Sequence, residues 1–225
     1  LMKFLTILFL GVVLLFYSSE KSLLDQVQAQ GELRVATRHG PSTYYKGPKG
    51  AAGLEYDLAK RFADELGVKL HLVVIDNFAD ILQTVANQEV HFAAAGLTIN
   101  NERKVLVRFA PNYQEVTQQV IYRQGSSPPP NNLADWNANY KLTVIAGSSQ
   151  SDFLKHFKID HPQFTWEELS EMEPGELLEQ VWDGEIKYAL VNSNEVTQMR
   201  RFYPELQIAF EIPESQQLAW AFPRL

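Results

Sequence analysis

The sequence predicts an α/β protein built as two lobes that close on each other like a hinged clamp. In the first half of the chain, strand-like apolar runs alternate with segments whose apolar residues recur at helical spacing, which is typical of a parallel sheet covered by helices. The same alternation starts again near residue 116 and predicts a second lobe. Two strand-like segments, near 118–123 and 218–222, are expected to join the lobes. Ligands of such sheets bind at the carboxyl ends of the strands, which here places the binding site in the cleft between the lobes.

The first lobe is expected over residues 22–122. Its clearest helix lies between Leu54 and Leu66, where apolar residues recur every four positions, and Gly67 follows at a typical C-cap position. The remaining expected elements are a polar helix or linker at 22–31, strands at 33–37, 69–75 and 91–97, a helix at 78–88, and a loop rich in Gly and Pro at 38–53.

The second lobe is expected over residues 123–217, and 218–225 is expected to be a second hinge strand. A loop is marked by the three consecutive prolines at 128–130. The expected elements are strands at 116–122, 141–146, 164–169, 187–191, 206–210 and 218–222, and helices that start at 151 and cover 174–183 and 196–202.

The N-terminal segment 1–21 predicts export. Lys3 precedes an apolar stretch from Phe4 to Tyr17, and small polar residues follow, which is the layout of a secretory signal. The stretch is shorter than the roughly 20 residues that span a bilayer as a helix. Because no clean A-x-A cleavage site is present, removal of the signal and retention as a membrane anchor both stay open.

Composition and motifs exclude several functional classes. The chain has 20 Lys and Arg against 27 Asp and Glu, a net charge of −7, which argues against a nucleic-acid partner. It has no cysteine, and its five histidines form no metal-binding motif, so no metal site is expected. No phosphate-binding Gly-rich loop and no G-x-S-x-G elbow is found, so we expect no cofactor and no catalytic residue in this chain. An acidic cluster that ends at Glu173 is expected to be a solvated face.

The most informative candidate binding residues follow the expected strand at 91–97. Gly96 starts the turn, Thr98 offers a hydroxyl and a backbone N–H, and Arg103 offers a planar fork of donors that suits a carboxylate. These residues alone are equally consistent with an N-cap and a surface arginine.

Two further segments add candidates in the expected cleft. Ser148 and Ser149 lie between a strand and a helix, where free backbone N–H groups can hold an anion, although a βα turn with a serine cap explains them as well. Tyr44 and Tyr45 follow the first strand and are candidates for covering a ligand, although single exposed tyrosines are common.

The segment Gly53 to Ala63 resembles the signature helix of the family 3 extracellular solute-binding proteins, the amino-acid receptors of bacterial ABC importers, apart from Tyr56 and Phe62. The segment from Gly96 to Arg103 is similar to that family's carboxylate-binding segment, in which Thr98 and Arg103 match the binding positions. The resemblance implies a type II periplasmic-binding-protein fold and a small carboxylate-bearing ligand between the lobes.

Segments 31–45 and 94–98 resemble one branch in particular, the membrane-bound lytic murein transglycosylases F. In that branch a solute-binding-like module precedes a C-terminal lytic transglycosylase domain that cleaves peptidoglycan. The resemblance implies a regulatory module in the periplasm, associated with the outer membrane, whose partners are the attached catalytic domain and, through it, peptidoglycan. It also implies that the first lobe is completed, and the catalytic domain supplied, by sequence beyond residue 225. The alternative is a free substrate-binding protein of an amino-acid importer.

Two departures from the amino-acid receptors concern the ligand. Those receptors place an Asp of the second lobe on the ligand's ammonium, and Asn192 stands at the matching strand end. An amide oxygen accepts a hydrogen bond from an amine without supplying a charge. Arg38 stands where many importers have an acidic or neutral residue. A peptide or muropeptide is therefore as consistent with the sequence as a free amino acid.

Overall fold

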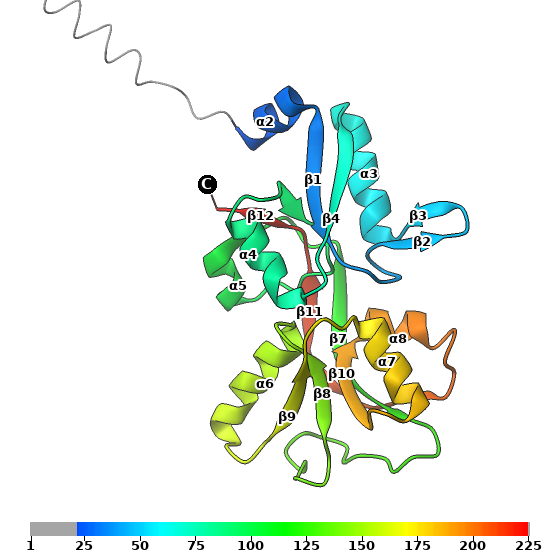
Figure 1. Cartoon of the computed structure of the whole chain (residues 1–225). Helices are drawn as coiled ribbons and strands as arrows, with labels where there is room; N and C mark the ends of the chain where they lie inside the picture. The colour runs from blue at the N-terminus through cyan, green and yellow to red at the C-terminus, as the bar shows by residue number, and fades with distance from the viewer. Residues whose placement is uncertain (1–21, 225) are drawn as a thin grey trace, which may run out of the picture.

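The computed structural model describes residues 22–224 and has two α/β lobes stacked one above the other (Figure 1). The predicted signal or anchor at 1–21 lies outside the described residues. Strands β7 (Gln114–Arg123) and β11 (Leu206–Leu218) run together between the lobes (Figure 1). The two-lobed α/β organisation expected from the alternating pattern is confirmed.

The sheet of the first lobe has the order β4-β1-β5-β12-β6. β1 pairs in parallel with β4 and β5, whereas β12 is antiparallel to both β5 and β6. The bounds are β1 Glu32–Thr37, β4 Lys69–Val74, β5 Phe92–Ala93, β6 Val107–Phe109 and β12 Ala221–Pro223. Strand β12, the last of the described elements, therefore lies inside this sheet and not at its edge.

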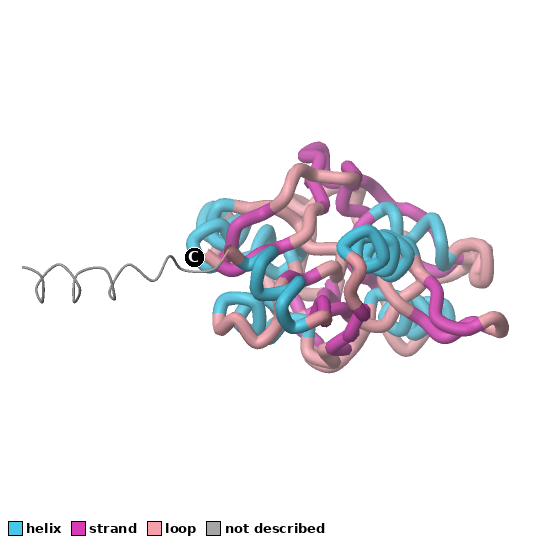
Figure 2. Tube along the Cα trace, turned by 90° about the horizontal axis from the view of Figure 1, so that it is seen from above, coloured by secondary structure: helices cyan, strands magenta, loops and turns pink. Residues whose placement is uncertain are grey.

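The helices of the first lobe cover both faces of its sheet. They are α2 (Leu23–Gln30), α3 (Leu54–Leu66), the short η1 (Phe78–Asp80) with α4 (Ile81–Ala86), and α5 (Asn101–Leu106). Residues of α2 and α3 pack in one buried cluster, and residues of α4 pack in another on the other side of the sheet. In the view from above, helices and strands of the two lobes overlap along the stacking direction (Figure 2).

Helix α3 has the predicted bounds but buries a different face from the one that the leucine spacing suggests. Ala59 and Ala63 are fully buried, whereas Leu54 and Leu58 are 48% and 38% exposed. Small side chains on the inner face allow the helix axis to approach the sheet closely. Its C-cap is Gly67, as predicted, and this residue has the left-handed conformation at φ +70°.

The loop expected at 38–53 contains a hairpin, β2 (Tyr45–Gly47) and β3 (Gly50–Ala52). Gly53 follows it at φ +131°, and a Cβ there would lie 2.3 Å from the carbonyl oxygen of Thr43. Only glycine fits this approach, which fixes the start of α3 against the loop that follows β1.

The sheet of the second lobe has the order β11-β7-β10-β8-β9. β8 is parallel to β9 and β10, and β7 is antiparallel to β10 and β11. Its further strands are β8 Leu142–Ile145, β9 Trp166–Leu169 and β10 Tyr188–Asn192, and its helices are α6 Ser149–Asp160, α7 Pro174–Asp183 and α8 Ser193–Met199.

Strand β11 is longer than expected, because it continues from Leu206 to Leu218 instead of ending near residue 210. Its pairing with β7 shifts register between Ile208 and Phe210 and again between Ile212 and Gln216. Pro213 lies in the second irregularity, where its missing N–H cannot support the hydrogen-bond ladder.

The two connections between the lobes lie side by side. The backbone N–H of Ala110 donates to the carbonyl of Trp220 at 2.9 Å, and that of Tyr113 donates to Leu218 at 3.0 Å. Both connections therefore form one short hydrogen-bonded hinge, the geometry expected of a clamp.

Candidate functional site

The carboxyl ends of β1 and β5 in the first lobe face those of β8 and β10 in the second. The loops that leave these strands enclose a small cavity of about 20 Å³. Five residues predicted from the sequence line it, two from the first lobe and three from the second: Gly96, Thr98, Ser148, Ser149 and Asn192. The structure thus brings these residues together from distant parts of the chain.

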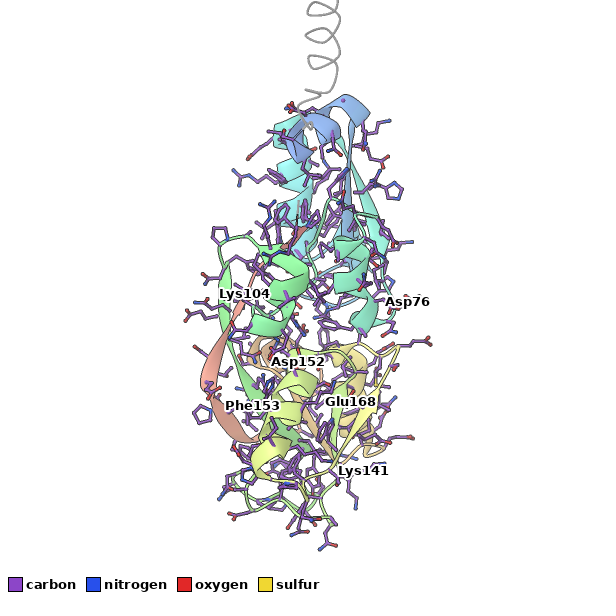
Figure 3. All side chains as sticks on the ribbon, turned by 90° about the vertical axis from the view of Figure 1, so that its left-hand side faces the viewer. Asp76, Lys104, Lys141, Asp152, Phe153 and Glu168 are labelled. Atoms are coloured by element: carbon purple, nitrogen blue, oxygen red, sulfur yellow. The ribbon has the colours of Figure 1, made fainter. Side chains whose placement is uncertain are left out.

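Arg103 reaches from α5 across the junction of the lobes. Its backbone N–H is capped by the side chain of Asn100 at 2.8 Å. Its Nη2 donates to the carbonyl of Gly147 at 3.0 Å and lies 3.2 Å from Oδ2 of Asp152, and its Nη1 donates to the carbonyl of Thr98 at 3.3 Å. Figure 3 places Asp152 at the level where the lobes meet. Burial lowers the pKa of Arg103, and Asp152 opposes that effect.

The hydroxyl groups of the two lobes meet at Thr98 and Ser149. Oγ1 of Thr98 donates to Oγ of Ser149 at 3.2 Å, and Ser149 donates in turn to Oε1 of Gln216 at 3.0 Å. Ser148 caps helix α6, because its Oγ accepts from the N–H of Ser151 at 3.2 Å. Ser148 therefore combines the role of a helix cap with a place in the cavity wall.

Asn192 ends β10, and its Oδ1 accepts from Nε2 of Gln150 at 2.7 Å. Both residues line the cavity. In the closed arrangement the amide oxygen of Asn192 is already engaged within the second lobe.

An ion cluster that local sequence pattern does not predict lies at the cavity and joins Arg38 to two carboxylates of the second lobe. Nη1 of Arg38 donates to Oε2 of Glu173 at 2.7 Å, and Nη2 donates to Oε1 of Glu195 at 3.0 Å. Nε donates to the carbonyl of Ala95 at 2.9 Å, which fixes the guanidinium on the first lobe. Burial alone would lower the pKa of Arg38, but the two carboxylates raise it above its usual value.

The prediction that Glu173 belongs to a solvated acidic face is wrong. Glu173 caps the start of α7, and only 16% of its side chain is exposed. The sequence signal for this position is Pro174, because a proline is common in the first turn of a helix. It places Glu173 at the N-terminus of α7. Burial raises the pKa of Glu173, and Arg38 opposes that rise.

The two tyrosines lie elsewhere in the first lobe. Tyr44 packs on His39, with ring centroids 5.7 Å apart, and on Tyr56 at 5.8 Å. Tyr45 lies in the hairpin and is 43% exposed. Neither lines the cavity between the lobes. A ligand-covering role for them stays a prediction.

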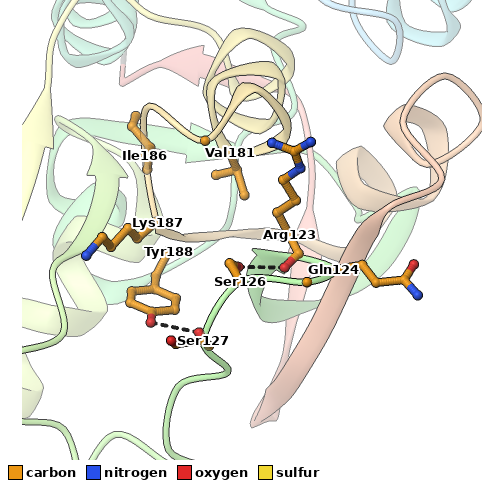
Figure 4. A pocket seen from close by; sticks show the side chains of 10 residues that line it. Arg123, Gln124, Ser126, Ser127, Val181, Ile186, Lys187 and Tyr188 are labelled. Carbon is orange, nitrogen blue, oxygen red and sulfur yellow. Dashed lines mark hydrogen bonds between the residues drawn. The ribbon is translucent and has the colours of Figure 1, made fainter.

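A larger cavity of about 490 Å³ lies at the far end of the second lobe (Figure 4). Arg123, Lys187 and Tyr188 are among its lining residues, and none of the predicted site residues is. Tyr188 donates to the carbonyl of Ser127 at 2.9 Å (Figure 4).

Residues 22–224 contain neither a candidate metal centre nor a membrane-spanning helix. No group of three or more His, Asp or Glu side chains in that range could hold a metal ion. In the same range no helix is long and apolar enough to cross a membrane.

Curated relatives share much of the sequence. The membrane-bound lytic murein transglycosylase F of Saccharophagus degradans is 42% identical over 201 residues, 89% of this chain and 40% of the relative. The membrane-bound lytic murein transglycosylase F 1 of Alkalilimnicola ehrlichii is 41% identical over 204 residues, 90% of this chain and 41% of the relative. The chain thus spans about two fifths of the length of these relatives.

Solved structures share the fold. The arginine-bound form of truncated ArgBP from T. maritima superposes with a TM-score of 0.78 at 21% identity, covering 89% of this chain and 92% of that one. The cysteine-binding protein from Campylobacter jejuni gives a TM-score of 0.77 at 20% identity, covering 89% of this chain and 80% of that one. These similarities confirm the predicted type II two-lobed fold. The profile of the bacterial extracellular solute-binding proteins, family 3, matches residues 33–211, and the chain belongs to that family.

Proposed function

We propose that this chain is an exported, ligand-binding regulatory module of a peptidoglycan lytic transglycosylase, located in the periplasm at the membrane. The observation that carries the proposal is the cavity between the lobes, which predicted residues of both lobes line. The names of the curated relatives supply the transglycosylase part of the proposal. The ligand is a small molecule with a carboxylate: an amino acid, a peptide or a muropeptide.

Binding requires the lobes to part, because about 20 Å³ holds little more than one water molecule. Opening at the hinge separates Arg103 from the carbonyl of Gly147 and from Asp152, which both belong to the second lobe. The freed guanidinium and the hydroxyl of Thr98 then bind the ligand's carboxylate, and closure adds donors from Ser148 and Ser149. A ligand that binds the closed and open states with different affinities shifts the equilibrium between these states. This shift is what regulates a catalytic domain attached to the lobes.

The first test is a titration calorimetry panel of amino acids, alanyl dipeptides and murein tri- and tetrapeptides on the chain. The second is the release of muropeptides from purified sacculi by the full-length protein, with and without the tightest binder. We expect at least one probe to bind and to change the rate of release. If no probe binds, the proposal fails. If a probe binds and the rate is unchanged, regulation fails and a free importer receptor becomes the better description.

A further inference from the structure

The carboxylate of Glu195 has one oxygen without a partner. The residue lies in the first turn of α8 and is 3% exposed. Its Oε1 accepts from Nη2 of Arg38 at 3.0 Å and from Oγ of Ser42 at 2.9 Å. Its Oε2 is buried and has no hydrogen-bond donor among the described residues. An unsatisfied buried carboxylate oxygen is costly, so its retention calls for a donor that is absent from the chain itself.

The charges around the cavity leave a surplus of negative charge at this oxygen. Arg38 faces two carboxylates, Glu173 and Glu195, while Arg103 is paired with Asp152. The ring of Phe78 lies 5.4 Å from the guanidinium of Arg38 and adds a surface that favours cations. Because Glu195 lines the cavity, a cation there would complete the ion cluster.

The members of the cluster belong to different lobes, so opening must separate them. Arg38 is held on the first lobe by the carbonyl of Ala95, and a Cβ on Gly96 would lie only 3.2 Å from its Nη2. Glu195 is on the second lobe. When the lobes part, Arg38 stays behind and both oxygens of Glu195 become available to a ligand.

We propose that Glu195 recognises a protonated amino group of the ligand, and that the guanidinium of Arg38 takes part of this position when no ligand is bound. Asn192, at the strand end where amino-acid receptors carry an acid, supplies no charge and already accepts from Gln150. In this chain the negative charge is carried instead by Glu195, one helical turn after Asn192. The proposal rests on the proposed function and narrows the ligand to molecules that carry both a carboxylate and a protonated amine.

The test uses the full chain and pairs of probes: L-alanine, L-glutamate, L-phenylalanine and L-alanyl-L-alanine, each free and N-acetylated. Titration calorimetry compares the unaltered protein with Glu195→Gln, with Glu195→Asp and with the exposed control Glu185→Gln. We expect the free form of at least one probe to bind the unaltered protein ten times or more tightly than its acetylated form. Glu195→Gln should reduce that preference to within twofold, whereas Glu195→Asp and Glu185→Gln should keep it.

The outcomes separate the two proposals. Equal binding of free and acetylated probes, or a preference that survives in Glu195→Gln, overturns the role of Glu195 and leaves the carboxylate-binding function standing. Absence of binding by every one of these probes, and by the murein tri- and tetrapeptides of the first panel, overturns both. Glu195→Asp guards against a trivial loss of folding, because it keeps the charge while changing the packing.

Discussion

Gly147 of the second lobe lies so close to Ala79 of the first that a Cβ on Gly147 would stand 2.7 Å from the Ala79 Cα. Backbone and small side chains thus form the contact between the lobes at this point. The close approach exists only when the clamp is closed, so it gives a way to alter closure without altering the charged residues.

Gly147→Ala should therefore favour the open clamp. The added methyl group collides with Ala79, and Gly147 also has φ +73°, which strains an alanine in either state. Gly125→Ala is the matched control, because Gly125 has φ +87° and nothing within 4 Å of its Cβ position. The chain has no cysteine, so spin labels on Asp57→Cys and Asp160→Cys can report the distance between the lobes. A longer distance in Gly147→Ala alone is expected, and equal distances in both variants would contradict the steric argument.

Arg38→Gln should also open the clamp in the absence of ligand. Removing one partner of a buried ion pair costs about 3–5 kcal/mol if the remaining charges stay buried. Opening instead returns Glu173 and Glu195 to water. The same pair of spin labels measures the effect, and Arg61→Gln is the control, because Arg61 is exposed and pairs with the exposed Glu65 on its own helix. An unchanged distance in Arg38→Gln would show that Arg38 contributes nothing to closure.

Arg103→Lys should weaken the binding of carboxylate-bearing probes by about 10- to 100-fold. A lysine keeps the charge but loses the planar fork, and charge-assisted hydrogen bonds contribute roughly 1.5–3 kcal/mol each. Calorimetry with the tightest amino-acid probe gives the ratio of dissociation constants. Arg108→Lys, on the exposed side of the same lobe, should leave the affinity within twofold. Retention of full affinity in Arg103→Lys would exclude Arg103 from the carboxylate site.

Glu55→Gln should destabilise the protein and change its pH dependence. The carboxylate of Glu55 accepts from the N–H of Gly96 at 2.9 Å, from Nε1 of Trp220 at 2.7 Å and from the hydroxyl of Tyr113. A glutamine turns an NH₂ group toward one of these donors, which costs about 1–3 kcal/mol.

The sign of the pH effect follows from the pKa of Glu55. Burial raises this pKa above its usual value of about 4.5, against the effect of the three donors. Because the pKa of Glu55 is higher in the folded than in the unfolded state, protonated Glu55 adds to the free energy of unfolding. This contribution is complete below pH 4.5 and is lost as the pH rises through the pKa of the folded state. Urea unfolding from pH 4 to pH 8 should therefore show a difference between the unaltered protein and Glu55→Gln that shrinks as the pH rises. A difference that grows with pH would contradict the raised pKa.

Local pattern predicted much of the fold. The four-residue spacing from Leu54 and the C-cap at Gly67 gave the bounds of α3, because both depend on residues a few positions apart. The same spacing does not predict the inner face of that helix, because Ala59 and Ala63 carry little hydrophobic signal, although their small size is what lets the helix approach the sheet closely.

The site was harder to predict because its contacts are made between the lobes. The sequence predicts both Thr98 and Ser149, because each follows a strand whose end faces the cleft. Arg38 and Glu195 are 157 positions apart, and a glutamate in the first turn of a helix is ordinary on the surface. Only the closed arrangement shows that this glutamate is buried against an arginine.

The position of β12 between β5 and β6 has a consequence for the order of folding. The first lobe begins with β1, yet its sheet stays split until residues 221–223 are added, and by then the whole second lobe has been synthesised. The second lobe is continuous in sequence from β7 to β11, so it can fold as a unit first. The two parts of the first-lobe sheet are therefore joined only after the second lobe has been made, and β5 and β6 keep unpaired edges until β12 pairs with both.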